Sequence, residues 1–150
     1  MPSTIPAFKA ALLARLSAEA GLLGVQVSWG HPYPARLADE LIIIGNATSA
    51  PGQSPVGLGS GDREEEYHVA LLISVAGSAR VTQQALEERA FELAAAIEQS
   101  MIAWQFEEAP FGGVVDWALV LSMQSAEVLA ESGDAREASV TITVAVTARI

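Results

Sequence analysis

Residues 63–104 restrict the possible folds of this chain more than any other segment, because a long strand pattern runs directly into a long helix pattern. The segment REEEYHVALLISVAG alternates, and its apolar positions are Tyr67, Val69, Leu71, Ile73 and Val75. The segment VTQQALEERAFELAAAIEQSMIAW then has apolar residues every three or four positions, namely Leu86, Ala90, Leu93, Ile97, Met101 and Trp104. A period of two is typical of a half-buried strand, and a period near 3.6 is typical of an amphipathic helix. The segment predicts a helix packed on a sheet.

The rest of the chain adds one helix and four strands to this pair. A helix is expected to begin just after Thr4, with Pro6 in its first turn. Its apolar stripe is Ile5, Phe8, Leu12 and Leu16, widened by Leu13 and Leu23. Strands are expected over 25–29, 41–44, 114–123 and 138–150; in the third, Val115, Trp117, Leu119, Leu121 and Met123 share a face. The predicted fold is a single α+β domain over residues 1–150. It has a mainly antiparallel sheet, two helices on one face, and the order α-β-β-loop-β-α-β-β.

Residues 46–62, NATSAPGQSPVGLGSGD, form an extended loop rich in Gly, Pro and Ser. A loop this long in a small domain is usually functional, so we expect it to make contacts in an assembly. The candidate contact residues are Gly52, Val56, Leu58 and Gly59 in the loop, with Trp29, His31 and Tyr33 around the turn WGHPYP. The other two tryptophans, Trp104 and Trp117, are expected to pack in the core.

Charge and composition exclude several function classes. The 150 residues carry 18 acidic and 8 basic side chains, a net charge of −10, with a single lysine. Tight nucleic-acid binding needs basic surface, so gripping DNA is not expected. The chain has no cysteine, and no long apolar run or leader is evident, which favours a soluble protein of a reducing compartment.

Three segments of the chain resemble reactive motifs, and each has a simpler interpretation. The glycines of GLGSG precede a strand rather than a helix, which argues against a phosphate cradle. His31 and His68 fall in separate elements, so they do not make a metal site with Glu64 or Glu66. The run Glu64–Glu66 reads as solvated surface, because nothing separates acid and base roles. We therefore predict no enzyme activity, catalytic residue, metal or cofactor.

The ordered signatures WGHPYP, DELIIIG, the Gly-rich loop, REEEYHVALLISV, ALEERAFEL and a last strand ending ARI resemble the tail terminator proteins of long-tailed actinobacterial phages. The resemblance runs from Ile5 to Ile150, and departs from the family in the connection WQFEEAPFGG. It implies a homohexameric ring in the virion, assembled in the host cytoplasm, at the head–tail junction. The ring would cap the tail tube and end its polymerisation, with the major tail tube protein and a neck or head–tail connector protein as partners and no membrane.

In such a ring, genomic DNA passes through the lumen without specific binding, and an acidic lumen would suit that task. We hypothesise that some of the following acidic residues line or approach the channel: Glu64, Glu65, Glu66, Glu87, Glu88 and Glu92. Two alternatives remain open. One is another head–tail connector or head-completion ring, and the other is a host dimeric α+β binding module.

Overall fold

The computed structural model describes residues 3–32, 38–49, 64–78, 80–128 and 135–149. In chain order its elements are helix α1 (Ile5–Ala18), the short 3-10 helix η1 (Ala20–Leu22), strands β1 (Gln26–Trp29), β2 (Glu40–Ser49) and β3 (Glu64–Ser78), helix α2 (Gln83–Gln105), the short 3-10 helix η2 (Pro110–Gly113), and strands β4 (Trp117–Val128) and β5 (Ala135–Arg149). None of the described helices is long and apolar enough to cross a membrane.

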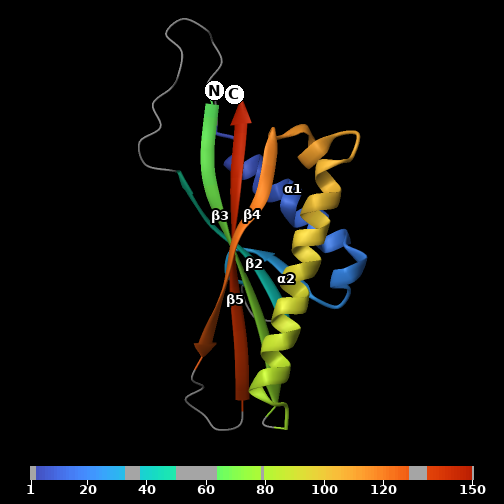
Figure 1. The fold of residues 1–150 in the computed structure, drawn as a ribbon, viewed down its shortest axis with the longest axis vertical. Helices are drawn as coiled ribbons and strands as arrows, with labels where there is room; N and C mark the ends of the chain where they lie inside the picture. Colours follow the sequence, from blue (N-terminus) through green and yellow to red (C-terminus); the bar gives the residue numbers. More distant parts are fainter. Residues whose placement is uncertain (1–2, 33–37, 50–63, 79, 129–134, 150) are drawn as a thin grey trace, which may run out of the picture.

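The strands form one sheet in the order β1-β2-β3-β5-β4. Strand β1 runs parallel to β2, and every other neighbouring pair is antiparallel. Both helices pack on the same face of this sheet, α2 against β3, β4 and β5, and α1 against β1 and β2 (Figure 1). The predicted α+β class and order of elements are confirmed. We call the face without helices the open sheet face.

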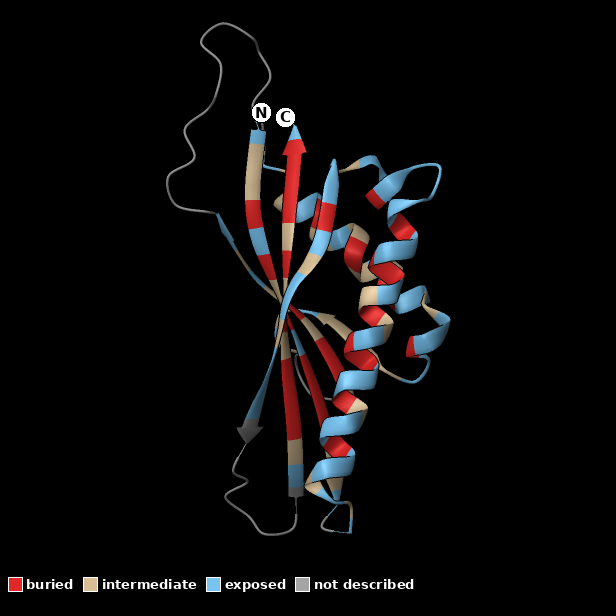
Figure 2. Ribbon diagram, in the orientation of Figure 1, coloured by how far each residue is buried: buried red, intermediate tan, exposed pale blue. Residues whose placement is uncertain are grey.

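The core lies between the sheet and the two helices. All six residues of the predicted α2 stripe are buried, as are the five predicted apolar positions of β3. Along α2 the buried positions face the sheet and the exposed ones face away (Figure 2). Helix α2 begins where Thr82 accepts a hydrogen bond from the backbone N–H of Ala85, at 3.1 Å, which satisfies one of the free donors of the first turn.

Helix α1 begins at Ile5, as predicted, and buries Phe8, Leu12 and Leu16. The ring of Phe8 packs between Tyr67 of β3 and Trp104 of α2, with centroid distances of 6.3 and 6.4 Å. The prediction for Leu23 is wrong, because its side chain is 81% exposed. Helix α1 ends at Ala18 and the chain turns through η1, so Leu23 no longer follows the helical stripe.

The predicted loop at 46–62 starts too early, because β2 continues through Asn46 to Ser49. A bulge between Ile44 and Ala47 lets the chain keep pairing with β3. Gly45 fits at this bulge because an added Cβ would lie 3.1 Å from the carbonyl oxygen of Ala70. The rest of the loop lies outside the described residues.

The facing predicted for residues 114–123 is wrong for three of its five residues, whereas Val115 is buried and Met123 packs against the core as expected. Trp117, Leu119 and Leu121 are 41%, 43% and 55% exposed, whereas Ala118 between them is buried. The strand starts at Trp117 rather than at 114, and a bulge between Val120 and Ser122 shifts its alternation. Both helices pack on the other face of the sheet, so the side chains of β4 on the open sheet face have no helix to cover them.

Candidate assembly surfaces

The six acidic residues proposed for a channel lie on different faces of the molecule. Glu65 is on the helix side, because its neighbour in register is the buried Ala148 of β5. Its carboxylate accepts hydrogen bonds from the Thr4 backbone N–H and hydroxyl, both at 2.8 Å, and from the Ser3 hydroxyl at 2.5 Å. A carboxylate at a helix N-terminus also interacts favourably with the helix dipole. Glu65 therefore anchors the start of α1 to β3.

Tyr67 extends this anchor into the core. Its side chain is buried, and its hydroxyl lies 3.2 Å from the Thr4 hydroxyl. Burial raises the pKa of Tyr67 to about 12, while the hydrogen bond with Thr4 lowers the pKa and the nearby Glu65 carboxylate raises it. The neutral phenol is the form that fits this environment.

Glu64 and Glu66 flank Glu65 in β3 and lie on the open sheet face. The alternation of the sequence predicted that these two residues share one side of the strand. Glu64 is exposed and lies opposite Arg149 of β5, and Glu66 lies opposite Thr147. Glu66 lines a small groove with His68, Trp117 and Ala145. This is one acidic surface, at the N-terminal end of β3.

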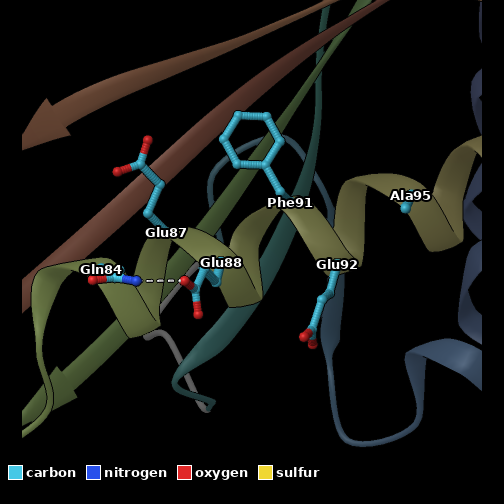
Figure 3. A pocket seen from close by; sticks show the side chains of 6 residues that line it. All are labelled: Gln84, Glu87, Glu88, Phe91, Glu92 and Ala95. Carbon is cyan, nitrogen blue, oxygen red and sulfur yellow. Dashed lines mark hydrogen bonds between the residues drawn. The ribbon is translucent and has the colours of Figure 1, made fainter.

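Glu87, Glu88 and Glu92 form a second acidic surface, on the solvent side of α2. They surround Phe91, which is 38% exposed, in a shallow depression that Gln84 and Ala95 complete (Figure 3). Gln84 donates a hydrogen bond to Glu88 at 2.8 Å. The sheet separates this surface from Glu64 and Glu66, so one straight channel wall cannot include both groups.

Arg89 ties the helix to the sheet beneath this second surface. Its guanidinium donates to both carboxylate oxygens of Glu40, at 2.5 and 3.1 Å, and to Glu92 at 3.1 Å. These hydrogen bonds raise the pKa of Arg89 above its usual value. The bidentate geometry fixes the first turns of α2 against the start of β2.

Two of the proposed contact residues are described, and they lie apart from both acidic surfaces. Trp29, 45% exposed, ends β1, where the Lys9 ammonium of α1 lies 4.9 Å from its ring centroid. His31 is exposed, and its Nδ1 lies 3.3 Å from the carbonyl oxygen of Pro32. Tyr33, Gly52, Val56, Leu58 and Gly59 lie outside the described residues, so their assignment as contacts stays a prediction.

An apolar surface that the sequence analysis did not identify lies on the open sheet face. Trp117 and Leu119 of β4 belong to it, because their rows continue to Glu66 and His68 of β3, and Leu72 of β3, 37% exposed, lies further along the same face. Thr141 and Thr143 of β5 lie between the two strands in register. The alternating pattern predicted that Trp117 and Leu119 share a side, but it could not show which side the helices cover. Exposed apolar surface of this kind is typical of protein–protein contact.

The described side chains do not assemble a reactive site. His31 and His68 are on different elements, and no group of three potential metal ligands occurs within the described ranges. Glu64 is exposed opposite Arg149, and Glu66 is half-buried beside Thr147, His68 and Trp117.

Comparison with known proteins gives a structural match only. No protein-family model matches the chain, and no curated protein matches it. Among solved structures, the fold is similar to a chain in "Virion of native gene transfer agent (GTA) particle". The two share 19% sequence identity with a TM-score of 0.57, and the match covers 98% of this chain and 99% of that chain. The likeness therefore extends over the whole domain, and it establishes that the two chains share a fold.

Proposed function

We propose that this protein is a structural component of a phage-like virion, and that it is the tail terminator. The observation that carries the proposal is the match, over nearly all of both chains, to a chain of a gene transfer agent virion. The sequence signatures that resemble tail terminators point to the same class of particle. The exposed apolar residues of the open sheet face fit a protein that works by contact.

The proposed task is to end the growth of the tail tube. A tube made of identical stacked rings is an open head-to-tail assembly and does not stop by itself. A terminator ring binds the last tube ring through one surface and offers no further tube-binding surface on the other. In this proposal six copies form the ring, its other side meets the neck, and DNA crosses its lumen.

The test is the solution mass of the purified protein, measured by light scattering before and after tail tube protein is added. We expect a monomer or a hexamer alone, and capped tubes of limited length after mixing. Unlimited tubes of the same length distribution with and without this protein would refute the terminator role. If the protein instead binds a purified neck protein and ignores the tube protein, it is a connector ring.

A further inference from the structure

Helix α2 carries a second line of apolar side chains, on its solvent side. Phe91, Ile102 and Phe106 are 38%, 47% and 79% exposed, and Ala95 between them is exposed as well. Their spacings of four, seven and four residues keep them on one side of a helix with 3.6 residues per turn, nearly opposite the buried stripe. We call these four residues the outer stripe. A surface helix normally presents charged and polar residues there, so the outer stripe marks a contact surface.

Acidic side chains surround the beginning of the outer stripe. Phe91 lies in the shallow depression that Glu87, Glu88 and Glu92 help to line (Figure 3). Glu87 and Glu88 precede Phe91 by four and three residues, which makes both of them its neighbours on the helix surface. In Figure 3 the Glu87 carboxylate and the Phe91 ring stand on the same side of the helix. A side chain that enters the depression therefore meets an aromatic ring and carboxylates together.

The two carboxylates nearest to Phe91 have no cation to balance them within the part of the chain that the structure describes. Glu88 accepts a hydrogen bond from the neutral Gln84. Arg89, the basic residue next to them in sequence, turns to the sheet and is held by the bidentate contact with Glu40. No described basic side chain forms an ion pair with Glu87 or Glu88. The depression therefore favours a positively charged occupant.

The open sheet face, which also has apolar and acidic residues, differs in this respect. There the exposed Glu64 lies directly opposite Arg149, so a positive charge of the chain itself stands beside the acidic one. The outer side of α2 is thus the surface on which an exposed aromatic ring and unbalanced carboxylates coincide.

Arginine is the side chain that complements both features of the depression. Its planar guanidinium stacks on aromatic rings and binds carboxylates through paired hydrogen bonds, whereas a lysine ammonium acts as a point charge. The rest of the outer stripe, Ala95, Ile102 and Phe106, offers apolar contact to residues that flank such an arginine. The fitting occupant is therefore a segment that combines arginine with apolar side chains.

Charge also separates the possible sources of this segment. Each copy of the chain has a net charge of −10, and packing α2 on α2 would bring glutamate against glutamate. A second copy is therefore repelled from this surface. A partner of opposite charge is attracted to it and oriented by the same field.

We propose that the solvent side of α2 is a docking surface for an arginine-bearing, partly apolar segment of another protein, with one arginine stacked on Phe91 and paired with Glu87 or Glu88. The inference goes beyond the proposed function, because it assigns a binding surface and the chemistry of its partner. In the proposed virion the partner is a different protein of the particle, and that step alone rests on the proposed function.

Selection from a displayed library of random peptides tests the chemistry without a known partner. The full-length wild-type protein is the bait, and a second selection uses a bait that carries Phe91→Ser, Glu87→Gln and Glu88→Gln. We expect the wild type to select peptides in which arginine stands beside apolar residues, and the triple variant to lose them. A selection that yields no binders, or binders without an excess of arginine, would overturn the proposal.

The aromatic contact is tested with the strongest selected peptide, labelled and followed by fluorescence anisotropy. The variant is Phe91→Ser, and the matched control is Leu72→Ser, because Leu72 is 37% exposed on the open sheet face and Phe91 is 38% exposed on α2. Circular dichroism verifies that both variants fold. We expect Phe91→Ser to raise the Kd of the peptide about tenfold and Leu72→Ser to leave it within about twofold of the wild type. An equal loss in both variants would place the peptide elsewhere.

The charge contact is tested with the same peptide. Glu87→Gln with Glu88→Gln and Glu64→Gln with Glu66→Gln remove two charges each, so a general effect of net charge would weaken binding equally in both. We expect only the first pair to raise the Kd, again about tenfold. Replacing the arginine of the peptide by lysine should weaken binding to the wild type and make little difference to Phe91→Ser. Identical effects of lysine on the two proteins would contradict the stacking of arginine on Phe91.

The remaining outcomes separate this proposal from the proposed function. If light scattering shows that the wild type self-associates and that Phe91→Ser does not, a second copy occupies the surface and the proposed partner is wrong. If the peptide results are as expected but the wild type fails to cap the tail tube, the docking surface stands and the terminator role falls. If the tube is capped and the α2 variants bind the peptide like the wild type, the terminator role stands and the docking surface falls.

Discussion

At the scale of single residues, Glu65 shows how one side chain can serve structure within an acidic run. Its neighbours Glu64 and Glu66 belong to the open sheet face, whereas Glu65 accepts three hydrogen bonds from Ser3 and Thr4. The strand places it there because alternate residues of β3 point to opposite faces. The carboxylate therefore holds the first turn of α1 on the sheet, and a role in a channel does not suit it.

We predict that Glu65→Ala lowers the free energy of unfolding by about 1–2 kcal/mol, because the Thr4 N–H and hydroxyl lose a charged acceptor in a partly buried site. Glu64→Ala is the matched control, since that neighbour is exposed, and we expect a change within about 0.5 kcal/mol. Urea unfolding followed by tryptophan fluorescence measures both variants. Equal effects would show that the hydrogen bonds to Ser3 and Thr4 contribute no net stability.

The raised pKa of Tyr67 leads us to predict that the folded protein loses stability at alkaline pH. Its pKa is raised to about 12 in the folded protein, chiefly by burial, from an ordinary value of 10.0. The folded state therefore favours the protonated phenol, and this contribution is complete below pH 10 and is lost as the pH rises through 12. We expect the urea midpoint of the wild type to fall more steeply between about pH 10 and 12 than that of Tyr67→Phe. Parallel pH profiles of the two proteins would contradict the assignment.

At the scale of elements, the start of α2 depends on a local cap. The Thr82 hydroxyl accepts from the Ala85 N–H at 3.1 Å, and the helix that follows supplies eight buried residues to the core. We predict that Thr82→Ala costs about 1 kcal/mol of unfolding free energy and that Thr82→Ser retains most of it. Thermal unfolding by circular dichroism measures the difference. A serine variant as unstable as the alanine variant would mean that the methyl group of Thr82, not its hydroxyl, stabilises α2.

Elements with a long, regular pattern were predictable from the sequence. The apolar stripe of α2 and the alternation of β3 and β5 extend over many residues, so their buried faces follow from local periodicity. Strand β4 was not predictable in this way. Its inward side depends on a bulge after Val120 and on its place at the sheet edge, and both are set by pairing with β5. The parallel pairing of β1 with β2 likewise depends on contacts far apart in the chain.

The candidate surfaces show the same limit. The acidic residues could be identified by type, but only the fold shows that Glu65 anchors α1 and that the others occupy two opposite faces. Trp117, Leu119 and Leu121 could be identified in the sequence as apolar residues of one strand. They were assigned to the core because sequence pattern alone does not show which face of a strand a helix covers.

At the scale of the whole molecule, the separation of the two acidic surfaces makes the channel hypothesis specific. Glu64 and Glu66 lie on the open sheet face, and Glu87 and Glu88 lie on the solvent side of α2. In a ring of identical subunits one of these faces can point to the lumen, and the other then points away. Repulsion between carboxylates and DNA acts over roughly 10 Å at moderate salt, so in the proposed ring only the lumen-facing pair should matter.

We therefore predict that neutralising one pair, and only one, slows DNA release from assembled particles. The two variants, Glu64→Gln with Glu66→Gln and Glu87→Gln with Glu88→Gln, change the net charge equally, so each is the control for the other. The measurement is the fraction of packaged DNA released with time, in particles verified to contain the variant ring. The difference in DNA release between the slowed variant and the wild type should shrink as salt is added. Added ions screen the two carboxylates that the wild type still carries. Equal slowing by both variants would show that total charge, rather than the lining of a channel, governs the passage of DNA. If neither variant slows release, none of these four glutamates lines the lumen.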